Sequence, residues 1–361
     1  MRILSVVGAR PEFIQVAPLA RALSRTDHEH VIVHTGQHYD SAMSDVFFAD
    51  LAVPAPNVML GVGSGSHGVQ TGRILEAMDP VLAEYNPDWV VVFGDTNSTL
   101  AGALSAVKLH TPVAHVEAGL RSFNRVMPEE INRIATDHIS DLLFAPTHVA
   151  MRQLESEGLL ARARLVGDIK TEITFAVRDA VAGIAPTLPP GVDAGLPYFV
   201  ATIHRAENTD DPDRLASIVG ALARAPHPVV LLVHPRLATR AKASGLALDV
   251  GSLVPAEPLA YAPMVNAVVN SAGVITDSGG LQKEAFLLEV PCTTVRTETE
   301  WVETVELGWN VLCPDPRQLA ALLDRPTPPA VSEAPYGVGD TAIRIVEELQ
   351  SLEPSALTSA P

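Results

Sequence analysis

The amino-acid sequence predicts an α/β protein with two domains, each built on a parallel β-sheet flanked by helices. Short runs rich in valine and isoleucine recur without polar alternation, as in strands that are buried on both faces. Each run ends abruptly in polar or glycine-rich residues, and a helical pattern of apolar residues follows. The chain has 361 residues, which is too long for one ordinary core and suggests two or three domains.

The predicted strands fall into two series along the chain. Four runs lie in the first half, at residues 3–7, 31–34, 90–93 and 113–116. Three more lie in the second half, at residues 199–203, 229–233 and 274–276. Because parallel strands need long crossovers, the segments between these runs are expected to contain helices.

A proline-rich segment separates the two series. Residues 183–197 contain four prolines and three glycines, a composition that disfavours both helix and sheet. We therefore expect a boundary near residue 185, with domains at 1–185 and 186–340. Apolar residues recur at helical spacing over residues 341–352, which predicts a final helix followed by a frayed tail within 341–361.

The polar clusters that follow the strands predict where a ligand binds. In an open α/β sheet, ligands bind at the carboxyl ends of the strands. Asp95 and Glu117 follow two successive predicted strands, and all seven runs end in a cluster of this kind. Any single cluster could simply terminate its strand, but seven together favour a binding site at this edge.

Composition and charge exclude several classes of function. The chain has 25 Lys and Arg against 42 Asp and Glu, a net charge of −17, which disfavours broad binding to nucleic acid or anionic membranes. No stretch approaches the length of a membrane-spanning helix, and no leader is evident, so we expect a cytoplasmic protein. Two cysteines exclude a disulfide framework and a four-cysteine metal site.

Two motifs place glycine or proline at the start of a predicted helix. The sequence DSGG at residues 277–280 precedes a predicted helix at 281–288, where backbone N–H groups could bind an anion. It could equally be a helix cap with a tight turn. The sequence GARPE at residues 8–12 matches neither GxGxxG nor the P-loop, so neither a nicotinamide cofactor nor ATP is indicated.

A cluster of acidic residues is the strongest catalytic candidate. On a predicted helix beginning at residue 128, Glu129 and Arg133 lie four apart and away from the apolar stripe. They could form an ordinary exposed ion pair worth ~0.3–0.5 kcal/mol. With Asp95 and Glu117, however, three carboxylates could converge and divide acid and base duties among them.

Two histidines follow strands of the second half. His204 and His234 could each be a structural residue, a phosphate ligand or an acid–base group. The histidines are scattered and no HExxH motif occurs, so no metal site is expected. The Gly-x-Ser-x-Gly elbow of serine hydrolases is also absent from the sequence.

Taken together, the motifs resemble those of the non-hydrolysing UDP-N-acetylglucosamine 2-epimerase family. The matching segments run in order through nearly the whole chain: residues 8–12, 94–96, 115–121, 128–133, 204–207, 276–280 and 335–337. The resemblance implies a GT-B architecture, in which two Rossmann-like domains face each other across a cleft and a final helix crosses back to the first domain. It also implies a UDP-sugar substrate, no cofactor and a homodimer.

The resemblance implies a mechanism as well. A base removes the proton at C2 of the sugar while UDP leaves from C1, and UDP then adds back to the glycal with C2 inverted. The residues on catalytic positions are Asp95, Glu117, Glu129, Arg133 and His204. Those on substrate-binding positions are Arg10, Gln15, His234, Met264, Ser278, Gly279, Gly280 and Glu284.

Several positions depart from the family pattern. Gln15 stands where a lysine is usual, Met264 where an aromatic residue is common, and Trp301 where an arginine is common. Residues 167–169 read Gly-Asp-Ile instead of Gly-Asn-Thr, and residues 37–40 lack the arginine typical of members with a regulatory UDP-sugar site. Some of these features favour relatives that act on UDP-2,3-diacetamido-glucuronate.

The sequence therefore leaves alternatives open. The first choice is a UDP-N-acetylglucosamine 2-epimerase, and the second is the diacetamido-glucuronate epimerase, with Arg121 or Arg296 pairing the uronate carboxylate. A GT-B glycosyltransferase would share the fold but not the Glu117 and Glu129 motifs. A hydrolysing epimerase usually carries an attached kinase domain, and a silent sensor is disfavoured because the five catalytic side chains are present.

Overall fold

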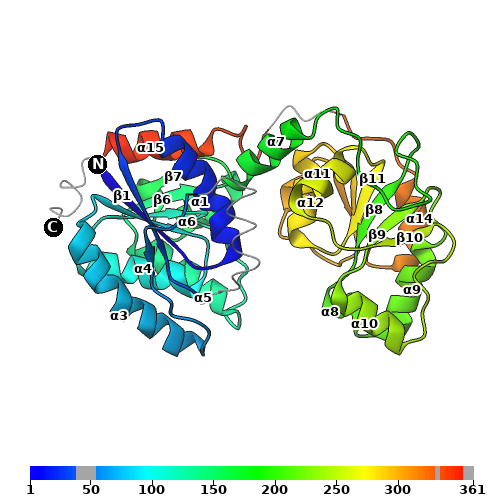
Figure 1. Cartoon of the computed structure of the whole chain (residues 1–361), viewed down its shortest axis with the longest axis horizontal. Helices are drawn as coiled ribbons and strands as arrows, with labels where there is room; N and C mark the ends of the chain where they lie inside the picture. The colour runs from blue at the N-terminus through cyan, green and yellow to red at the C-terminus, as the bar shows by residue number, and fades with distance from the viewer. Residues whose placement is uncertain (38–53, 330–333, 353–361) are drawn as a thin grey trace. The chain divides into compact units, whose positions relative to one another are not determined.

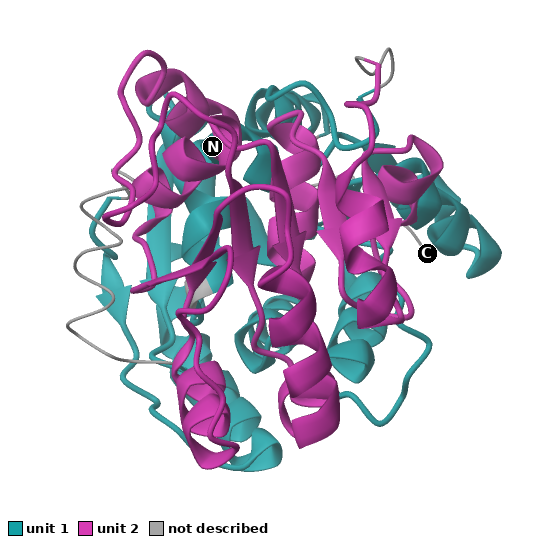
Figure 2. Ribbon diagram, turned by 90° about the vertical axis from the view of Figure 1, so that its right-hand side faces the viewer, with its two compact units in different colours: residues 1–173, 334–361 teal, residues 174–333 magenta. Residues whose placement is uncertain are grey.

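The computed structural model describes residues 1–37, 54–329 and 334–352, which form two compact units. Unit 1 consists of Met1–Ile173 and Ala334–Pro361, and unit 2 consists of Thr174–Glu333 (Figures 1 and 2). Each unit is a parallel sheet with helices on its faces, so the predicted fold class is confirmed. None of the helices in the described ranges has the length and apolar character needed to cross a membrane.

Unit 1 is built on a seven-stranded parallel sheet, with the order β3-β2-β1-β4-β5-β6-β7. Its strands are β1 (Arg2–Val7), β2 (Glu29–His34), β3 (Val58–Met59), β4 (Trp89–Phe93), β5 (Val113–Val116), β6 (Leu142–Ala145) and β7 (Ala163–Leu165). Its helices are α1 (Arg10–Leu23), α3 (His67–Tyr85), α4 (Asn97–Lys108), α5 (Pro128–Ile139), α6 (His148–Ser156), the start of α7 (Lys170–Ala180) and α15 (Thr341–Ser351), with a 3₁₀ turn at Leu160–Arg162.

Unit 2 is built on a six-stranded parallel sheet, with the order β10-β9-β8-β11-β12-β13. Its strands are β8 (Phe199–Thr202), β9 (Val229–Leu232), β10 (Leu253–Ala256), β11 (Gly273–Thr276), β12 (Cys292–Thr294) and β13 (Asn310–Leu312). Its helices are α8 (Ala206–Thr209), α9 (Pro212–Leu222), α10 (Pro235–Ala243), α11 (Tyr261–Val269), α12 (Gly279–Leu287), α13 (Val302–Glu306) and α14 (Leu319–Leu323), with a 3₁₀ turn at Pro316–Gln318.

Both faces of each sheet are buried, which explains the unbroken apolar runs of the sequence. Along β8, Phe199 and Ala201 belong to one core cluster, whereas Val200 belongs to another. Successive strand residues point to opposite faces, so the two clusters cover the two faces of the sheet. In unit 1 the five residues of β4 are all fully buried.

The division between the units falls inside α7 and not near residue 185. Glu172 on the first turn of α7 accepts a hydrogen bond from Ala342 N of α15, both in unit 1. Thr174, two residues later, hydrogen-bonds the hydroxyl of Tyr261 in unit 2 at 3.1 Å. The contacts of this helix therefore set the boundary, and the proline-rich residues 183–197 form irregular chain within unit 2.

The end of the chain returns to unit 1 earlier than residue 341. Unit 1 resumes at Ala334, and α15 packs against α1. Tyr336 is fully buried, and its carbonyl accepts a 2.8 Å hydrogen bond from Asp168 N. Residues 334–337 thus support the segment that leads into α7.

Candidate active site

The carboxylates of unit 1 lie at the ends of two adjacent parallel strands. Asp95 follows β4 by two residues, and Glu117 follows β5 directly. Glu117 has a φ of 74°, a left-handed conformation that is strained for a residue with a side chain. Strain of this kind persists only where the surrounding contacts hold it in place, and the contacts of Glu117 are described next.

Glu117 is held by a lysine and an amide. Lys170 Nζ lies 2.7 Å from Oε1 and 2.9 Å from Oε2 of Glu117, and Gln15 Nε2 donates to Oε2. The Glu117 side chain is only 12% exposed. Burial lowers the pKa of Lys170, but Glu117, Asp168 and Asp95 outweigh it and the net shift is upward, so the lysine remains an ammonium ion.

Asp95 is held by Arg133 of α5. The guanidinium of Arg133 pairs with Asp95 and also with Glu130, the latter at 2.9 Å. Burial lowers the pKa of Arg133, but the two carboxylates outweigh it and raise the pKa overall. Asn132 Nδ2 donates to the carbonyl of Asp95 at 2.9 Å, which fixes the backbone of the same residue.

Glu129 and Arg133, which could have formed an ion pair, do not pair with each other. The partner on α5 is Glu130, three residues before Arg133, and its carboxylate also accepts from Ser122 N and Phe123 N at 2.9 and 2.8 Å. Glu129 lies exposed on the first turn of α5, and no ion pair joins it to Arg133 in the described part of the chain. Its carboxylate is therefore open to solvent.

A second layer of charge lies behind these carboxylates. His115 Nδ1 lies 2.7 Å from Asp137 Oδ1, and Arg121 pairs with Asp137 and Glu157, also at 2.7 Å. The Arg121 side chain is 1% exposed. Arg121 is therefore engaged in this network, which disfavours it as the partner of a uronate carboxylate.

Glu12 is a buried carboxyl group for which the sequence motifs predicted no role. It accepts hydrogen bonds from Gly8 N and Ala9 N at 2.5 and 2.8 Å, and from two threonine hydroxyls of the β4–α4 turn. Burial raises its pKa to about 7, against the lowering effect of these donors. Glu12 thus joins the start of α1 to the turn that follows Asp95.

In unit 2 the strand-end carboxylate of Asp277 has a structural role. Asp277 is fully buried after β11 and accepts from His204 N, Arg205 N and Asn208 Nδ2 at 2.9–3.1 Å. The Asp277 carboxylate therefore organises the chain that follows β8. Asp277, the first residue of the DSGG motif, therefore supports the neighbouring chain. The other three residues of the motif remain available at the end of β11.

The two predicted histidines of unit 2 lie together. The rings of His204 and His234 are 5.2 Å apart, and His204 Nδ1 is 3.4 Å from Asp277 Oδ1. Burial lowers the pKa of His204, and the neighbouring His234 and Arg205 lower it further against the effect of Asp277. His204 is accordingly a neutral imidazole at neutral pH. His234 caps α10 by accepting from Arg236 N at 3.1 Å.

The glycines at the start of α12 leave an open helix N-terminus. Ser278 is the N-cap but makes no side-chain capping bond. A Cβ on Gly280 would meet nothing within 4 Å, whereas one on Gly279 would overlap Oε1 of Glu300. The backbone N–H groups of Gly279 and Gly280 have no acceptor in the described ranges, which suits an anion.

The other predicted binding residues of unit 2 lie on α11 and α12. Glu284 hydrogen-bonds the hydroxyl of Tyr261, and burial together with Glu284 raises the pKa of that hydroxyl. Met264, half-buried, packs against the core cluster beneath α11.

Arg296, the other candidate partner of a uronate carboxylate, is 8% exposed and already pairs with Glu300 at 2.7 Å. The side chain of Arg10 and residues 38–40 lie outside the described residues.

Trp301, which stands where the family pattern commonly has an arginine, contacts the first turn of α12. Its indole Nε1 donates to the carbonyl of Gly279 at 2.8 Å, and Lys283 Nζ lies 4.5 Å from the ring centre. The indole therefore anchors the first turn of the helix. Sequence reasoning identified Trp301 only as a missing arginine, because a contact 22 residues apart leaves no local pattern.

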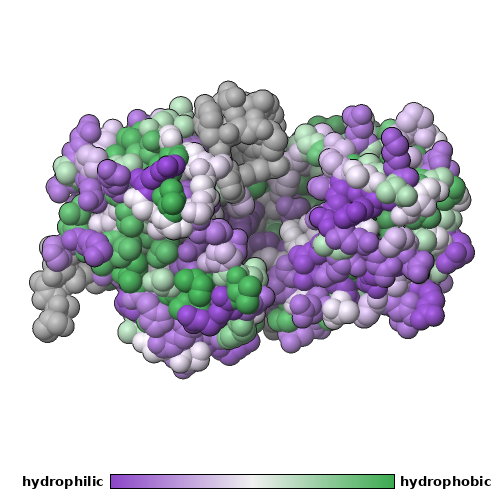
Figure 3. Space-filling view, turned by 90° about the horizontal axis from the view of Figure 1, so that it is seen from below, coloured by the Kyte–Doolittle hydropathy of each residue, from purple (hydrophilic) through white to green (hydrophobic). Residues whose placement is uncertain are grey.

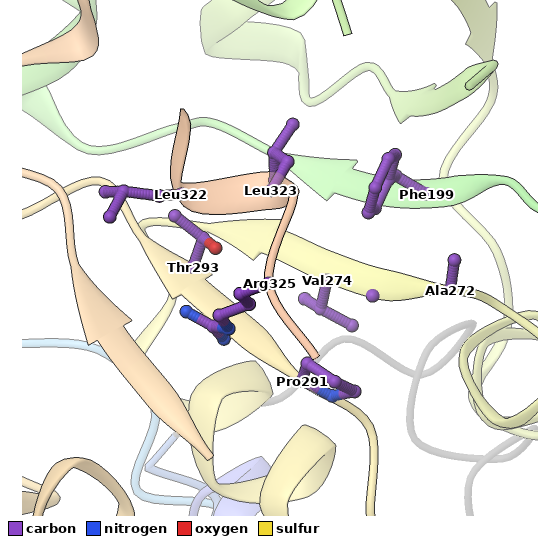
Figure 4. A pocket seen from close by; sticks show the side chains of 9 residues that line it. Phe199, Ala272, Val274, Pro291, Thr293, Leu322, Leu323 and Arg325 are labelled. Carbon is purple, nitrogen blue, oxygen red and sulfur yellow. The ribbon is translucent and has the colours of Figure 1, made fainter. Parts of the chain in front are cut away.

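Two cavities are lined by none of the predicted catalytic or substrate-binding residues. One of about 20 Å³ lies where β8, β11 and β12 begin, beside Arg325 (Figure 4), and is too small for a nucleotide. The other, an open hollow of about 460 Å³ on unit 1, is bordered by α3 and α5. Figure 3 shows unit 1 with more hydrophobic surface than unit 2 in that view.

No group of three or more potential metal ligands occurs among the described residues.

Comparisons with known proteins agree with this arrangement. A family model described as UDP-N-acetylglucosamine 2-epimerase matches residues 21–350. The UDP-2,3-diacetamido-2,3-dideoxy-D-glucuronate 2-epimerase of Pseudomonas aeruginosa is 44% identical, covering 98% of this chain and 100% of the relative.

Solved structures agree as well. The structure of UDP-GlcNAc 2-epimerase from Methanocaldococcus jannaschii matches with a TM-score of 0.84 and 38% identity, and covers 98% of this chain and 100% of that chain. The enzyme from Neisseria meningitidis bound to UDP-GlcNAc matches with a TM-score of 0.84, 27% identity and the same coverage. Sequence and structure therefore agree that the chain belongs to the UDP-N-acetylglucosamine 2-epimerase family.

Proposed function

We propose that this chain is a UDP-N-acetylglucosamine 2-epimerase, which interconverts UDP-GlcNAc and UDP-ManNAc by eliminating and re-adding UDP through a glycal. The observation that carries the proposal is the pair of strand-end carboxylates in unit 1, each held by its own cation. Inversion at C2 requires that a proton leave one face of the sugar and return to the other. At least two proton-carrying groups are therefore needed.

Asp95, Glu117 and Glu129 are the three groups proposed for this proton transfer. Asp95 pairs with the guanidinium of Arg133, and Glu117 pairs with the ammonium of Lys170. Glu129 is exposed on the first turn of α5 and is open to exchange protons with water. These different surroundings support a division of acid and base roles among the three.

Unit 2 is proposed to bind the UDP moiety. Charge accumulates on the diphosphate as the C1–O bond breaks, and N–H donors stabilise it. Ser278, Gly279 and Gly280 supply the helix N-terminus, while His204 and His234 supply imidazole donors. Glu284 and Met264, on α12 and α11, are proposed to contact the nucleoside, with Arg10 and Gln15 of unit 1 as further substrate contacts.

An incubation without any acceptor tests the reaction. UDP-GlcNAc is mixed with the protein and followed by proton NMR at the anomeric and C2 positions. An equilibrium mixture of the two C2 epimers, still attached to UDP, is the expected result. Unchanged UDP-GlcNAc would favour a glycosyltransferase that waits for an acceptor, and release of free sugar with UDP would identify a hydrolysing enzyme.

The second candidate function is epimerisation of UDP-2,3-diacetamido-glucuronate. The 44% identity to an epimerase of that name favours it. The uronate carboxylate needs a cationic partner, yet Arg121 and Arg296 are both paired with carboxylates of the protein. This pairing supports UDP-GlcNAc as the first choice. A comparison of kcat/KM for the two UDP-sugars on one preparation decides between them.

A homodimer is also proposed. Phe123 and Val126, in the segment before α5, are 73% and 91% exposed, and Ile131 on α5 is 39% exposed beside the hollow of unit 1. Exposed apolar side chains of this kind support burial against a second copy. Analytical ultracentrifugation is expected to give a dimer mass, and a monomer at all concentrations would contradict it.

A further inference from the structure

The cation beside Glu117 comes from a helix start that no sequence motif marks. Lys170 is the first residue of α7, and its Nζ contacts both carboxylate oxygens of Glu117, at 2.7 and 2.9 Å. A two-point contact restrains the rotation of the carboxylate as well as compensating its charge. The lysine side chain is 27% exposed, so most of the contact is shielded from water.

The second donor to Glu117 carries no charge. Gln15, 1% exposed on α1, donates its Nε2 to Oε2 of Glu117. The carboxylate dictates this orientation of the amide, because the reverse would set two acceptor oxygens against each other. Gln15 therefore helps to orient Glu117 but leaves the neutralisation of its charge to Lys170.

The start of α7 is itself fixed. Asp168 accepts a 2.9 Å hydrogen bond from Lys170 N, and its own N–H is bound to the carbonyl of Tyr336. Gly167 has a φ of 93°, and a Cβ there would lie 3.1 Å from the same carbonyl. The Asp168 carboxylate also favours the ammonium form of Lys170. The ammonium is thus presented by a rigid turn and not by a loose surface side chain.

We propose that Lys170 is a positioning residue for epimerisation, whose ammonium compensates the charge of the Glu117 carboxylate and holds it aimed for proton transfer. The inference rests on the proposed function, and Lys170 acts through Glu117 without contacting the substrate. A carboxylate that is 12% exposed would be costly to keep ionised without a cation. Residue 15 is the other position from which a cation can reach the same carboxylate.

Moving the charge between these two positions tests the inference. Lys170→Met is expected to reduce kcat by ~10²-fold while KM stays within about threefold, because only positioning is lost. Lys170→Arg, which keeps a cation, should retain most of the activity. The double variant Gln15→Lys, Lys170→Met is expected to recover at least ~10-fold of the loss, because the new lysine faces Glu117 from α1.

The matched control is Arg164→Met, which breaks a pair with Glu348 at 3.1 Å elsewhere in unit 1 and should leave kcat unchanged. Thermal unfolding is measured for every variant. If wild-type protein shows no C2 epimerisation, the proposed function fails. If wild type is active and Lys170→Met keeps its kcat, only the role of Lys170 is overturned. If Lys170→Met does not fold, a folded double variant whose kcat stays ~10²-fold or more below that of wild type overturns it as well.

Discussion

The two units present opposite chemistry at the same edge of the same kind of sheet. In unit 1 the carboxylates of Asp95 and Glu117 are paired with side-chain cations, Arg133 and Lys170. In unit 2 the carboxylate of Asp277 is consumed by backbone and amide donors, and the edge offers imidazoles and helix N–H groups instead. A strand-end carboxylate is therefore reactive or structural according to which donors it meets.

Amide substitutions in unit 1 should give the largest effect. Asp95→Asn and Glu117→Gln keep the size of the side chain but remove its charge, so turnover should fall by ~10²-fold or more. UDP affinity, assigned to unit 2, should change by less than about threefold. Steady-state kinetics measures the turnover, and titration calorimetry measures the UDP affinity. Glu348→Gln is the control. Near-wild-type turnover in both site variants would show that the carboxylates of unit 1 are not the reactive ones.

The same kind of change in unit 2 should affect folding instead. Asp277→Ala leaves the N–H groups of His204 and Arg205 without an acceptor in a buried place, which should cost about 3 kcal/mol of unfolding free energy. Asp277→Asn retains one acceptor oxygen and should cost less. Chemical denaturation checks this order. Equal stability of wild type and Asp277→Ala would show that Asp277 is not a support.

The buried carboxyl group of Glu12 should make unit 1 less stable as the pH rises. Burial raises its pKa from 4.5 to about 7, so the folded state binds the proton more tightly than the unfolded state between those values. Stability from this group is therefore complete below the lower value and falls as the pH approaches the higher one, by up to about 3 kcal/mol.

Glu12→Gln removes this titration while the amide oxygen can still accept from Gly8 N and Ala9 N. The difference in unfolding free energy between wild type and variant, measured below pH 4.5 and above pH 7, isolates the effect. We expect the variant to gain relative stability as the pH rises. A difference that is independent of pH would contradict the assignment to Glu12.

The helix N-terminus of unit 2 should give the smallest effect. Gly280→Leu fits open space and should leave thermal unfolding nearly unchanged, yet it crowds the N–H groups and should weaken UDP binding ~10-fold. Gly279→Ala differs because its Cβ overlaps Oε1 of Glu300, so the end of that half-exposed side chain must move aside. Unchanged UDP affinity of Gly280→Leu in calorimetry would show that the motif only begins the helix and does not bind the diphosphate.

The sequence predicted the long buried strands well because their pattern is local. The strands β1, β4, β5, β8, β9 and β11 coincide closely with the apolar runs, and α5, α12 and α15 begin close to their predicted starts. The strands β3, β6, β7, β10, β12 and β13 were missed, because runs of only two to four residues carry little periodicity. The unit boundary was missed because tertiary contacts of Thr174 decide it.

The sequence predicted several residues of the site, but not which of them pair with each other. Asp95, Glu117 and Arg133 follow from strand ends and helix spacing, but the choice of Glu130 over Glu129 depends on the rotation of α5 against β4. Lys170 lies 53 residues from Glu117 along the chain and belongs to no motif. Only the missing lysine at position 15 hinted that the cation had to come from elsewhere.

The most direct test of the account is the isotope content of the product formed in deuterated water. If proton transfer at C2 is the chemistry of unit 1, UDP-ManNAc formed from UDP-GlcNAc should carry deuterium at C2, and Glu117→Gln should slow its incorporation together with turnover. Product that retains its original hydrogen at C2 would contradict the account, because no carboxylate would then have removed the proton.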